Sequence, residues 1–97
     1  MRYDLVLSPE ASEDLRRLDA HVRAAVRDAL EVHLRYEPTK LSRSRIKRLR
    51  GLAQPQYRLR VGEIRVFYDV AEETVVVHAI LTKSMVEQWL RETGKPL

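Results

Sequence analysis

The sequence predicts an α+β fold: an antiparallel β-sheet, made of an N-terminal strand and a three-strand meander, with an N-terminal helical hairpin packed on one face and a short C-terminal helix. Between residues 9 and 36, apolar residues recur at steps of three and four, the period of an amphipathic helix. From residue 57 to 70 the period becomes two, as in a half-buried strand. The helices are grouped instead of alternating with strands, which favours α+β over α/β.

Length and composition narrow the possible classes of protein. The 97 residues are enough for a single domain, 1–97, with one core. The absence of cysteine excludes disulfides and thiolate metal sites, and we expect neither a metal nor a cofactor. No apolar run approaches the ~18 residues of a membrane span, and the N-terminus lacks the apolar stretch of a signal peptide. We therefore expect a cytoplasmic protein with no membrane partner. Its net charge of +4 suggests a polyanionic partner.

The first third of the chain carries clear boundaries. Residues 2–7 alternate between apolar and polar and predict a short strand. Ser8 can cap a helix in which Pro9 takes the first position, and Asp19 is predicted to cap a second helix that Pro38 ends. Two helices joined by so short a link form an antiparallel hairpin. We expect its apolar stripe to lie on the inner face of the sheet.

Residues 39–56 have no clear period, which permits either a helical turn or an anchored loop. A long loop in a small domain is often functional, and the alternative is a surface connection whose leucines cover one end of the core. No acidic residue interrupts the basic residues of this segment, which are candidate contacts for a nucleic-acid backbone. They are Lys40, Arg43, Arg45, Lys47, Arg48 and Arg50.

The central hairpin is the most strongly patterned stretch. Residues 57–61 and 64–70 alternate on either side of Gly62-Glu63, which is typical of a hairpin with a type II′ turn. This turn fixes a register in which Arg60 faces Arg65. The core side of the same hairpin is then built from Tyr57, Leu59, Val66 and Tyr68.

The same register collects arginines on the other face. Arg58 faces Phe67 there, next to Arg60 and Arg65. Like charges directly opposite each other destabilise a sheet. One interpretation is a solvated polar face on which the arginines splay apart. The other is an anion site, because arginines at this spacing can grip a phosphate from several directions.

The C-terminal third predicts an inner strand and a short helix. Residues 75–81 are apolar on both faces, as expected of a strand covered on both sides. Ser84 and Glu87 have the spacing of a capping box, and Gly94 is a helix stop. Between them Trp89 belongs to a short apolar stripe that suits packing.

Several of these segments together resemble the RelE/ParE superfamily of bacterial toxins from type II toxin–antitoxin systems. The resemblance covers nearly the whole chain and rests on the Leu-Ser-Pro-Glu-Ala start at 7–11, the basic segment 47–52, the hairpin 57–68 and the valine-rich strand that leads to Lys83. It implies one of two activities: RelE-like members cut messenger RNA on the ribosome, and ParE-like members poison DNA gyrase. Both kinds are held inactive by an acidic antitoxin, which implies a hetero-oligomer.

The resemblance also implies roles for individual residues. Arg58 and Arg60 match the basic pair of the RelE strand, Arg65 matches the phosphate-gripping arginine of the next strand, and Lys83 lies near the basic residue that follows the last strand. RelE-like nucleases often add a tyrosine near the C-terminus. Here Trp89 is the nearest aromatic residue, and an indole has no hydroxyl.

Metal-independent RNA cleavage needs a base, an acid and cations that stabilise the phosphate. Arginine cannot be the base because it keeps its proton. His78 is the possible base, with an ordinary strand histidine as the alternative, whereas His33 is expected to be structural. Lys83 could act if its neighbours depressed its pKa. Phe67 could stack an RNA base, or it could be sheet surface covered by a loop.

Two classes of function therefore stay open. The first is a ribosome-dependent mRNA endoribonuclease toxin whose partners are ribosome-bound message and a cognate antitoxin. The second is a non-catalytic inhibitor of DNA gyrase that acts through its basic surface. A relic that only binds an antitoxin is a third interpretation.

Overall fold

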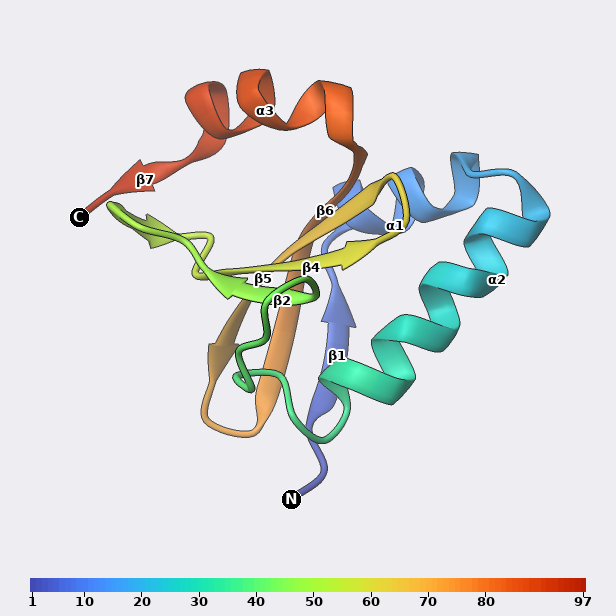
Figure 1. Cartoon of the computed structure of the whole chain (residues 1–97), viewed down its shortest axis with the longest axis horizontal. Coiled ribbons are helices and arrows are strands. Elements are labelled where there is room, and N and C mark those ends of the chain that lie inside the picture. Colours follow the sequence, from blue (N-terminus) through green and yellow to red (C-terminus); the bar gives the residue numbers. More distant parts are fainter.

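The structure is a computed structural model that describes all 97 residues (Figure 1). Its helices and strands confirm the predicted α+β class. In chain order they are β1 (Asp4–Leu7), α1 (Pro9–Arg17), α2 (Ala20–Ala29), the π-helical turn η1 (Leu30–Leu34), β2 (Ile46–Arg48), β3 (Leu52–Gln54), β4 (Tyr57–Val61), β5 (Ile64–Ala71), β6 (Thr74–Thr82), the 3₁₀ turn η2 (Lys83–Met85), α3 (Val86–Thr93) and β7 (Lys95–Pro96).

The main sheet has five strands in the order β1-β6-β5-β4-β2. Strands β4, β5 and β6 form the predicted antiparallel meander. The N-terminal strand is the exception to an antiparallel sheet, because β1 runs parallel to β6. Alternation of apolar residues reads the same in both directions, so the sequence pattern of 2–7 could not show which way the strand runs.

The β4–β5 hairpin has the predicted register. Leu59 pairs with Val66 on the core side, and Arg60 pairs with Arg65 on the other side. Gly62 has a φ of +59°, and Glu63 beside it does not enter the positive region. A type II′ turn requires this combination, since only its first central residue has a positive φ.

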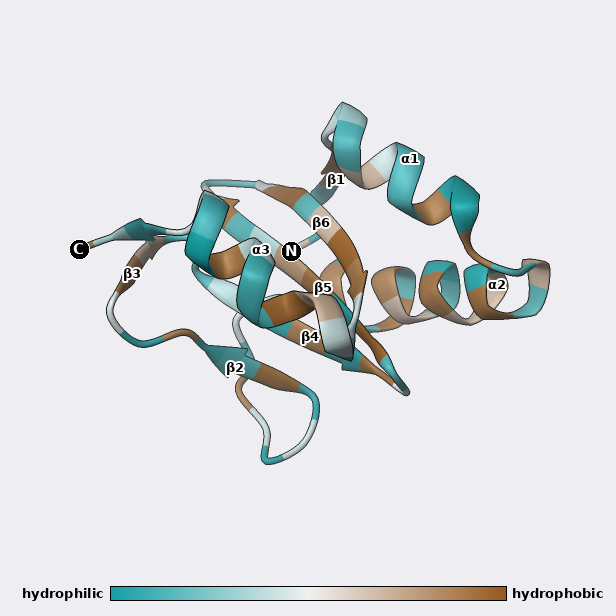
Figure 2. Cartoon of the chain, turned by 90° about the horizontal axis from the view of Figure 1, so that it is seen from above, coloured by the Kyte–Doolittle hydropathy of each residue, from teal (hydrophilic) through white to brown (hydrophobic).

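The helical hairpin covers one face of the sheet and forms the core with it (Figures 1 and 2). Ser8 caps α1 as predicted, because its Oγ accepts a hydrogen bond from the Ala11 N–H at 3.0 Å. Asp19 holds the cap position of α2 but makes no side-chain cap bond. None of the helices combines the length and apolar composition that crossing a membrane requires. The sheet contributes Ile46, Leu59, Ile64, Val66, Tyr68, Val75, Val77 and Ile80 to the core, and the helices contribute Ala11, Leu15, Val26, Leu30 and Leu34.

A β-bulge in β6 changes which residues face the core. Phe67 pairs with Ala79 and Tyr68 pairs with Val77, so His78 has no partner residue on β5. Ser8, which caps α1, and Asp14 within α1 bind backbone groups beside the bulge. The Ser8 hydroxyl donates to the His78 carbonyl at 3.2 Å, and a carboxylate oxygen of the α1 residue Asp14 accepts from the Ile80 N–H at 3.0 Å.

The segment 39–56 contains two strands that the sequence analysis missed. Strand β2 pairs with β4 at the edge of the main sheet, and β3 pairs with β7 in a separate two-stranded sheet. Each has three residues, which is too short to display a period of two. The expectation of a loop or helical turn was therefore wrong for these residues.

Helix α3 lies on the sheet face opposite the helical hairpin, as Figure 2 shows. The predicted capping box does not form: Ser84 lies inside η2, where its Oγ bonds the Thr82 hydroxyl at 3.2 Å, and α3 begins without a side-chain cap. Gly94 ends α3 as predicted, since its N–H bonds the Leu90 carbonyl at 2.8 Å. A Cβ at this position would lie 2.5 Å from that carbonyl oxygen, so the site requires glycine.

The buried Tyr68 hydroxyl gives a first prediction. It donates to the Pro38 carbonyl at 2.6 Å, and burial raises the pKa of the phenol far above its ordinary value, so the hydroxyl stays a donor. Tyr68→Phe should lower the free energy of unfolding by about 1–3 kcal/mol, because a buried carbonyl loses its partner. Urea denaturation measures this change. Tyr57→Phe is the matched control, since the stacked Tyr57 makes no side-chain hydrogen bond; equal stability losses in the two variants would contradict the prediction.

Candidate functional site

The face of the sheet under and beside α3 is basic. Arg60 lies opposite Arg65, and the edge strand places Lys47 opposite Arg58, so two cross-strand pairs of like charge lie next to each other. Lys83 follows at the end of β6. We call these five residues the basic face. None of them forms an ion pair, because every ion pair of the molecule involves other residues.

A depression of about 380 Å³ opens between the basic face and α3. It brings together three of the four predicted catalytic residues, namely Arg58, Arg65 and Lys83. Arg60 does not line it and is exposed beside it. Helix α3 supplies the opposite wall, with Val86, Glu87 and Leu90.

Arg65 is the one buried charged residue, with 8% of its surface exposed. Its Nη1 donates to the Gly62 carbonyl at 2.7 Å and to the Ile64 carbonyl at 3.1 Å, so the side chain folds back over its own turn. Carbonyl dipoles hold the guanidinium in place but do not neutralise it. Burying a charge without a counterion is costly, so this residue leaves the depression short of negative charge.

Arg58 also lacks a negatively charged partner. Its Nε is shielded from solvent and has no hydrogen-bond partner, and its Nη2 reaches only the Arg45 carbonyl at 3.5 Å. Burial lowers the pKa of Arg58, and the positive charges of Arg65 and Arg60 lower it further. An anion in the depression would give Arg58 a partner and offset all three effects.

Phe67 does not have the predicted role. Its ring was predicted to be available to stack an RNA base, but Phe67 is fully buried. Trp89 of α3 covers it in a stacked arrangement, with ring centroids 5.1 Å apart and planes at 26°. The packing role expected for Trp89 is therefore confirmed. The stacked pair lies between the depression and a second cavity.

His78, the predicted base, lines that second cavity and not the depression. The cavity holds about 260 Å³ and is bounded by the start of α1, the end of β3 and the side of α3. The Nε2 atom of His78 lies 2.8 Å from an oxygen of Asp69. Of the two interpretations of His78, a base that faces the arginines and an ordinary strand histidine, this position favours the second, because His78 and the arginines line different cavities.

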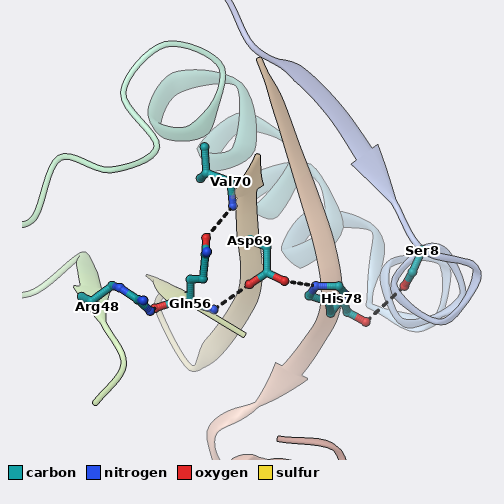
Figure 3. A network of polar contacts seen from close by, with 6 residues as sticks. All are labelled: Ser8, Arg48, Gln56, Asp69, Val70 and His78. Atoms are coloured by element: carbon teal, nitrogen blue, oxygen red, sulfur yellow. Dashed lines mark hydrogen bonds and ion pairs between the residues drawn. The ribbon is translucent and has the colours of Figure 1, made fainter. Parts of the chain in front are cut away.

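Figure 3 shows that Asp69 and His78 belong to a network that crosses the sheet. The other oxygen of Asp69 accepts from the Gln56 N–H at 2.7 Å, and the Gln56 side chain accepts from the Val70 N–H at 2.9 Å. The Arg48 guanidinium donates to the Gln56 carbonyl at 2.7 Å. The polar groups of the network thus bond to one another, and a structural role explains the network.

The basic residues of segment 39–56 do not form one patch. Lys47 lies on the basic face, whereas Lys40 is paired with a neighbouring glutamate at 3.4 Å. Arg48 lies over the ring of Tyr57, 5.3 Å from its centroid. The remaining members, Arg43, Arg45 and Arg50, are exposed.

Sequence reasoning missed Glu87 as a site residue. We expected it in a capping box, but it is the carboxylate that lines the depression, and its ion-pair partner is Arg91 at 3.5 Å. A signal was present, because Lys83 and Glu87 are four residues apart, the distance of one helical turn. No cluster of three His, Asp or Glu side chains is arranged to hold a metal ion.

Comparison with known proteins identifies the relatives of this fold. The family described as "ParE toxin of type II toxin-antitoxin system, parDE" matches residues 5–87. No curated protein sequence matches the chain.

Solved structures of similar fold come from toxin–antitoxin systems. The RelBE2 toxin–antitoxin complex of Mycobacterium tuberculosis matches with a TM-score of 0.73 and 25% identity, covering 84% of this chain and 99% of that one. The RelE–RelB complex of Pyrococcus horikoshii has a TM-score of 0.70 and 21% identity, covering 86% and 97%. A double-arginine mutant of RelE from E. coli in the free state has a TM-score of 0.68 and 24% identity, covering 92% of each chain.

His33 gives a prediction for the dependence of stability on pH. It lies in a hollow near Arg45 and Lys40, and burial, with the charge of Arg45, lowers its pKa below the ordinary 6.5. As the pH falls, His33 therefore binds a proton in the unfolded chain before it does so in the folded chain. The stabilising contribution is complete above pH 6.5 and is lost as the pH falls toward the folded-state pKa. Denaturation between about pH 7 and pH 5 should show His33→Gln losing less stability than the native chain. Parallel curves for the two proteins would contradict this.

Proposed function

The chain belongs to the ParE toxin family of type II toxin–antitoxin systems, and from this we propose that it is a toxin that cuts messenger RNA on the ribosome in the cytoplasm. The observation that carries the proposal is the depression of the basic face. Arg58, Arg65 and Lys83 converge there without an ion pair, since Glu87 of the same depression pairs with Arg91. The Nε of Arg58 is buried and has no hydrogen-bond partner. A phosphate group supplies both the negative charge and the acceptor oxygens that are missing.

The lining of the depression supports a metal-independent reaction. The three cations stabilise the charge that grows on the phosphate, and Arg65 is preorganised because its turn fixes its position. The Glu87 carboxylate accepts the proton of the ribose 2′-hydroxyl, whose oxygen attacks the phosphorus. The bond from phosphorus to the 5′-oxygen breaks, and Lys83 gives that oxygen a proton. The products are a 2′,3′-cyclic phosphate and a 5′-hydroxyl, and solvent restores both side chains.

A second candidate function is inhibition of DNA gyrase through the basic surface. Two observations favour it. The matching family is described by its ParE toxin, and no histidine lines the depression, because His78 lies in a different cavity. In this case Arg58 and Arg65 bind a target without reacting. Glu87 and Lys83 then have no chemical role.

Under both candidates we propose that an antitoxin neutralises the protein by covering the basic face. Solved relatives are toxin–antitoxin complexes, and an acidic segment would complement the five unpaired cations. Charge reversal at Arg58 and Arg65 together should weaken the complex and reduce its salt dependence, as measured by calorimetry in a salt series. A complex insensitive to salt and to this reversal would contradict the electrostatic part.

Substitution of Arg65 tests the nuclease proposal. Losing one preorganised donor costs on the order of 3 kcal/mol, so Arg65→Ala should cut ribosome-bound message about a hundredfold more slowly. Arg65→Lys should recover only part of the rate, because an ammonium cannot replace the planar fork of donors. The measurements are cleavage rate and thermal melting of each variant. Arg27→Ala, at an exposed position of α2, is the control and should keep the native rate.

The same proteins separate the two candidate functions. The nuclease proposal expects message cleavage and no effect on gyrase supercoiling. Loss of supercoiling activity without cleavage would replace it with the gyrase proposal. A fully toxic Arg65→Ala variant of native stability would show that the depression is not the active site.

A further inference from the structure

The basic face extends beyond the depression to the open edge of the sheet. Four of its five members lie on three neighbouring strands, with Arg65 on β5, Arg58 and Arg60 on β4, and Lys47 on β2. Lys47 and Arg60 are exposed and lie outside the depression. The positive charge therefore continues from beneath α3 to the β2 edge without an acidic interruption.

The spacing of these residues suits two anions better than one. Neighbouring strands lie about 4.8 Å apart, so β5 and β2 are separated by roughly 10 Å. Arg58 and Arg60 are two residues apart on one face of β4, which is roughly 6.6 Å. Lys47 and Arg60 do not line the depression, so a phosphate held there by Arg58, Arg65 and Lys83 leaves these two cations without an anion of their own. Successive phosphates of an extended single strand are spaced on this scale and can follow such a groove.

Helix α3 bounds the depression on the side away from β4 and β2. Val86 and Leu90 form the wall on the α3 side, and the stacked Phe67 and Trp89 block the way to the His78 cavity. A nucleic acid with one phosphate in the depression can therefore continue along the open and positively charged surface of β4 and β2.

We infer that a single-stranded nucleic acid leaves the depression across the β2 edge, where Lys47 and Arg60 hold the phosphate next to the one in the depression. This inference rests on the proposed binding of a nucleic acid. It adds a second phosphate subsite and the path that the nucleic acid takes from the depression. It also accounts for the like-charge pairs, because a second phosphate offsets the repulsion between Lys47 and Arg58 as well as that between Arg60 and Arg65.

Lysine on an edge strand has another known use, which is to prevent sheets from joining edge to edge. A lysine with only that use would not affect the binding of a nucleic acid. The two explanations therefore differ in a measurable way, and the length of the bound strand is the variable that separates them.

The experiment compares Lys47→Gln with Lys95→Gln, a matched control whose exposed lysine lies on β7, outside the main sheet. The probes are uncleavable 2′-deoxy strands: a dinucleoside monophosphate, which has one phosphate, and a tetranucleotide. Calorimetric titrations at several salt concentrations give the affinities. Lys47→Gln should bind the dinucleoside monophosphate as the native protein does, but the tetranucleotide roughly fivefold more weakly, with a salt slope lower by about 0.7. Lys95→Gln should change neither.

The stability of the free protein provides a second readout. Removing one charge of a like-charge pair should raise the melting temperature of Lys47→Gln by about 2 °C in the absence of nucleic acid. A subsite lysine thus weakens binding while its removal stabilises the fold, so misfolding cannot imitate the expected result.

Two outcomes would overturn the inference. One is a tetranucleotide affinity that Lys47→Gln leaves unchanged, and the other is an equal loss for both probes, which would mean a general charge effect and no second subsite. Failure of the proposed function looks different: Arg58→Ala and Arg65→Ala would then bind the dinucleoside monophosphate as well as the native protein.

Discussion

The register of the β4–β5 hairpin is the constraint on which the rest of the sheet depends. Gly62 adopts a φ of +59° that residues with a Cβ rarely reach, and the two-residue turn that results leaves one way to pair the strands. In this register the apolar side chains pack against the helical hairpin, and the arginines lie on the face that α3 covers. A shift by one residue would exchange the two faces and bury the arginines in the core. The like-charge pair Arg60–Arg65 is thus a consequence of the same turn that builds the core.

Helix α3 decides what the basic face can do. Its contact with the sheet is anchored by Trp89 on Phe67, and this pair divides the face into two hollows. The depression on one side has cations without partners, whereas the cavity on the other side has His78 tied to Asp69. The division removes the histidine from the arginines and leaves Glu87 as the carboxylate beside them. Any reaction in the depression must therefore use groups of α3 and of the turn before it.

The bulge at His78 connects the two sides of the molecule. It turns the side chain of His78 toward Asp69, while Ile80 returns to the core. Ser8 and Asp14, at the start of α1 and within it, bind the backbone of His78 and Ile80. The N-terminal helix thereby supports the strand that carries the α3 face, although it lies on the opposite side of the sheet. Disturbing Ser8 or Asp14 would for this reason affect both faces.

The sequence by itself determined the features that depend on local periodicity. These are the α+β class, the helical hairpin with its Ser8 cap, the register of residues 57–70 and the opposition of Arg60 and Arg65, because side-chain period and turn chemistry act between near neighbours. Tertiary structure alone decided the parallel direction of β1, the pairing of the short strands β2 and β3, and the burial of Phe67 under Trp89. It also decided which candidates share a site: Arg58, Arg65 and Lys83 meet, His78 does not, and Lys47 joins the arginines through β2. These relations join residues far apart in the chain, and a local pattern cannot encode them because it is the same whichever distant segment comes to lie beside it.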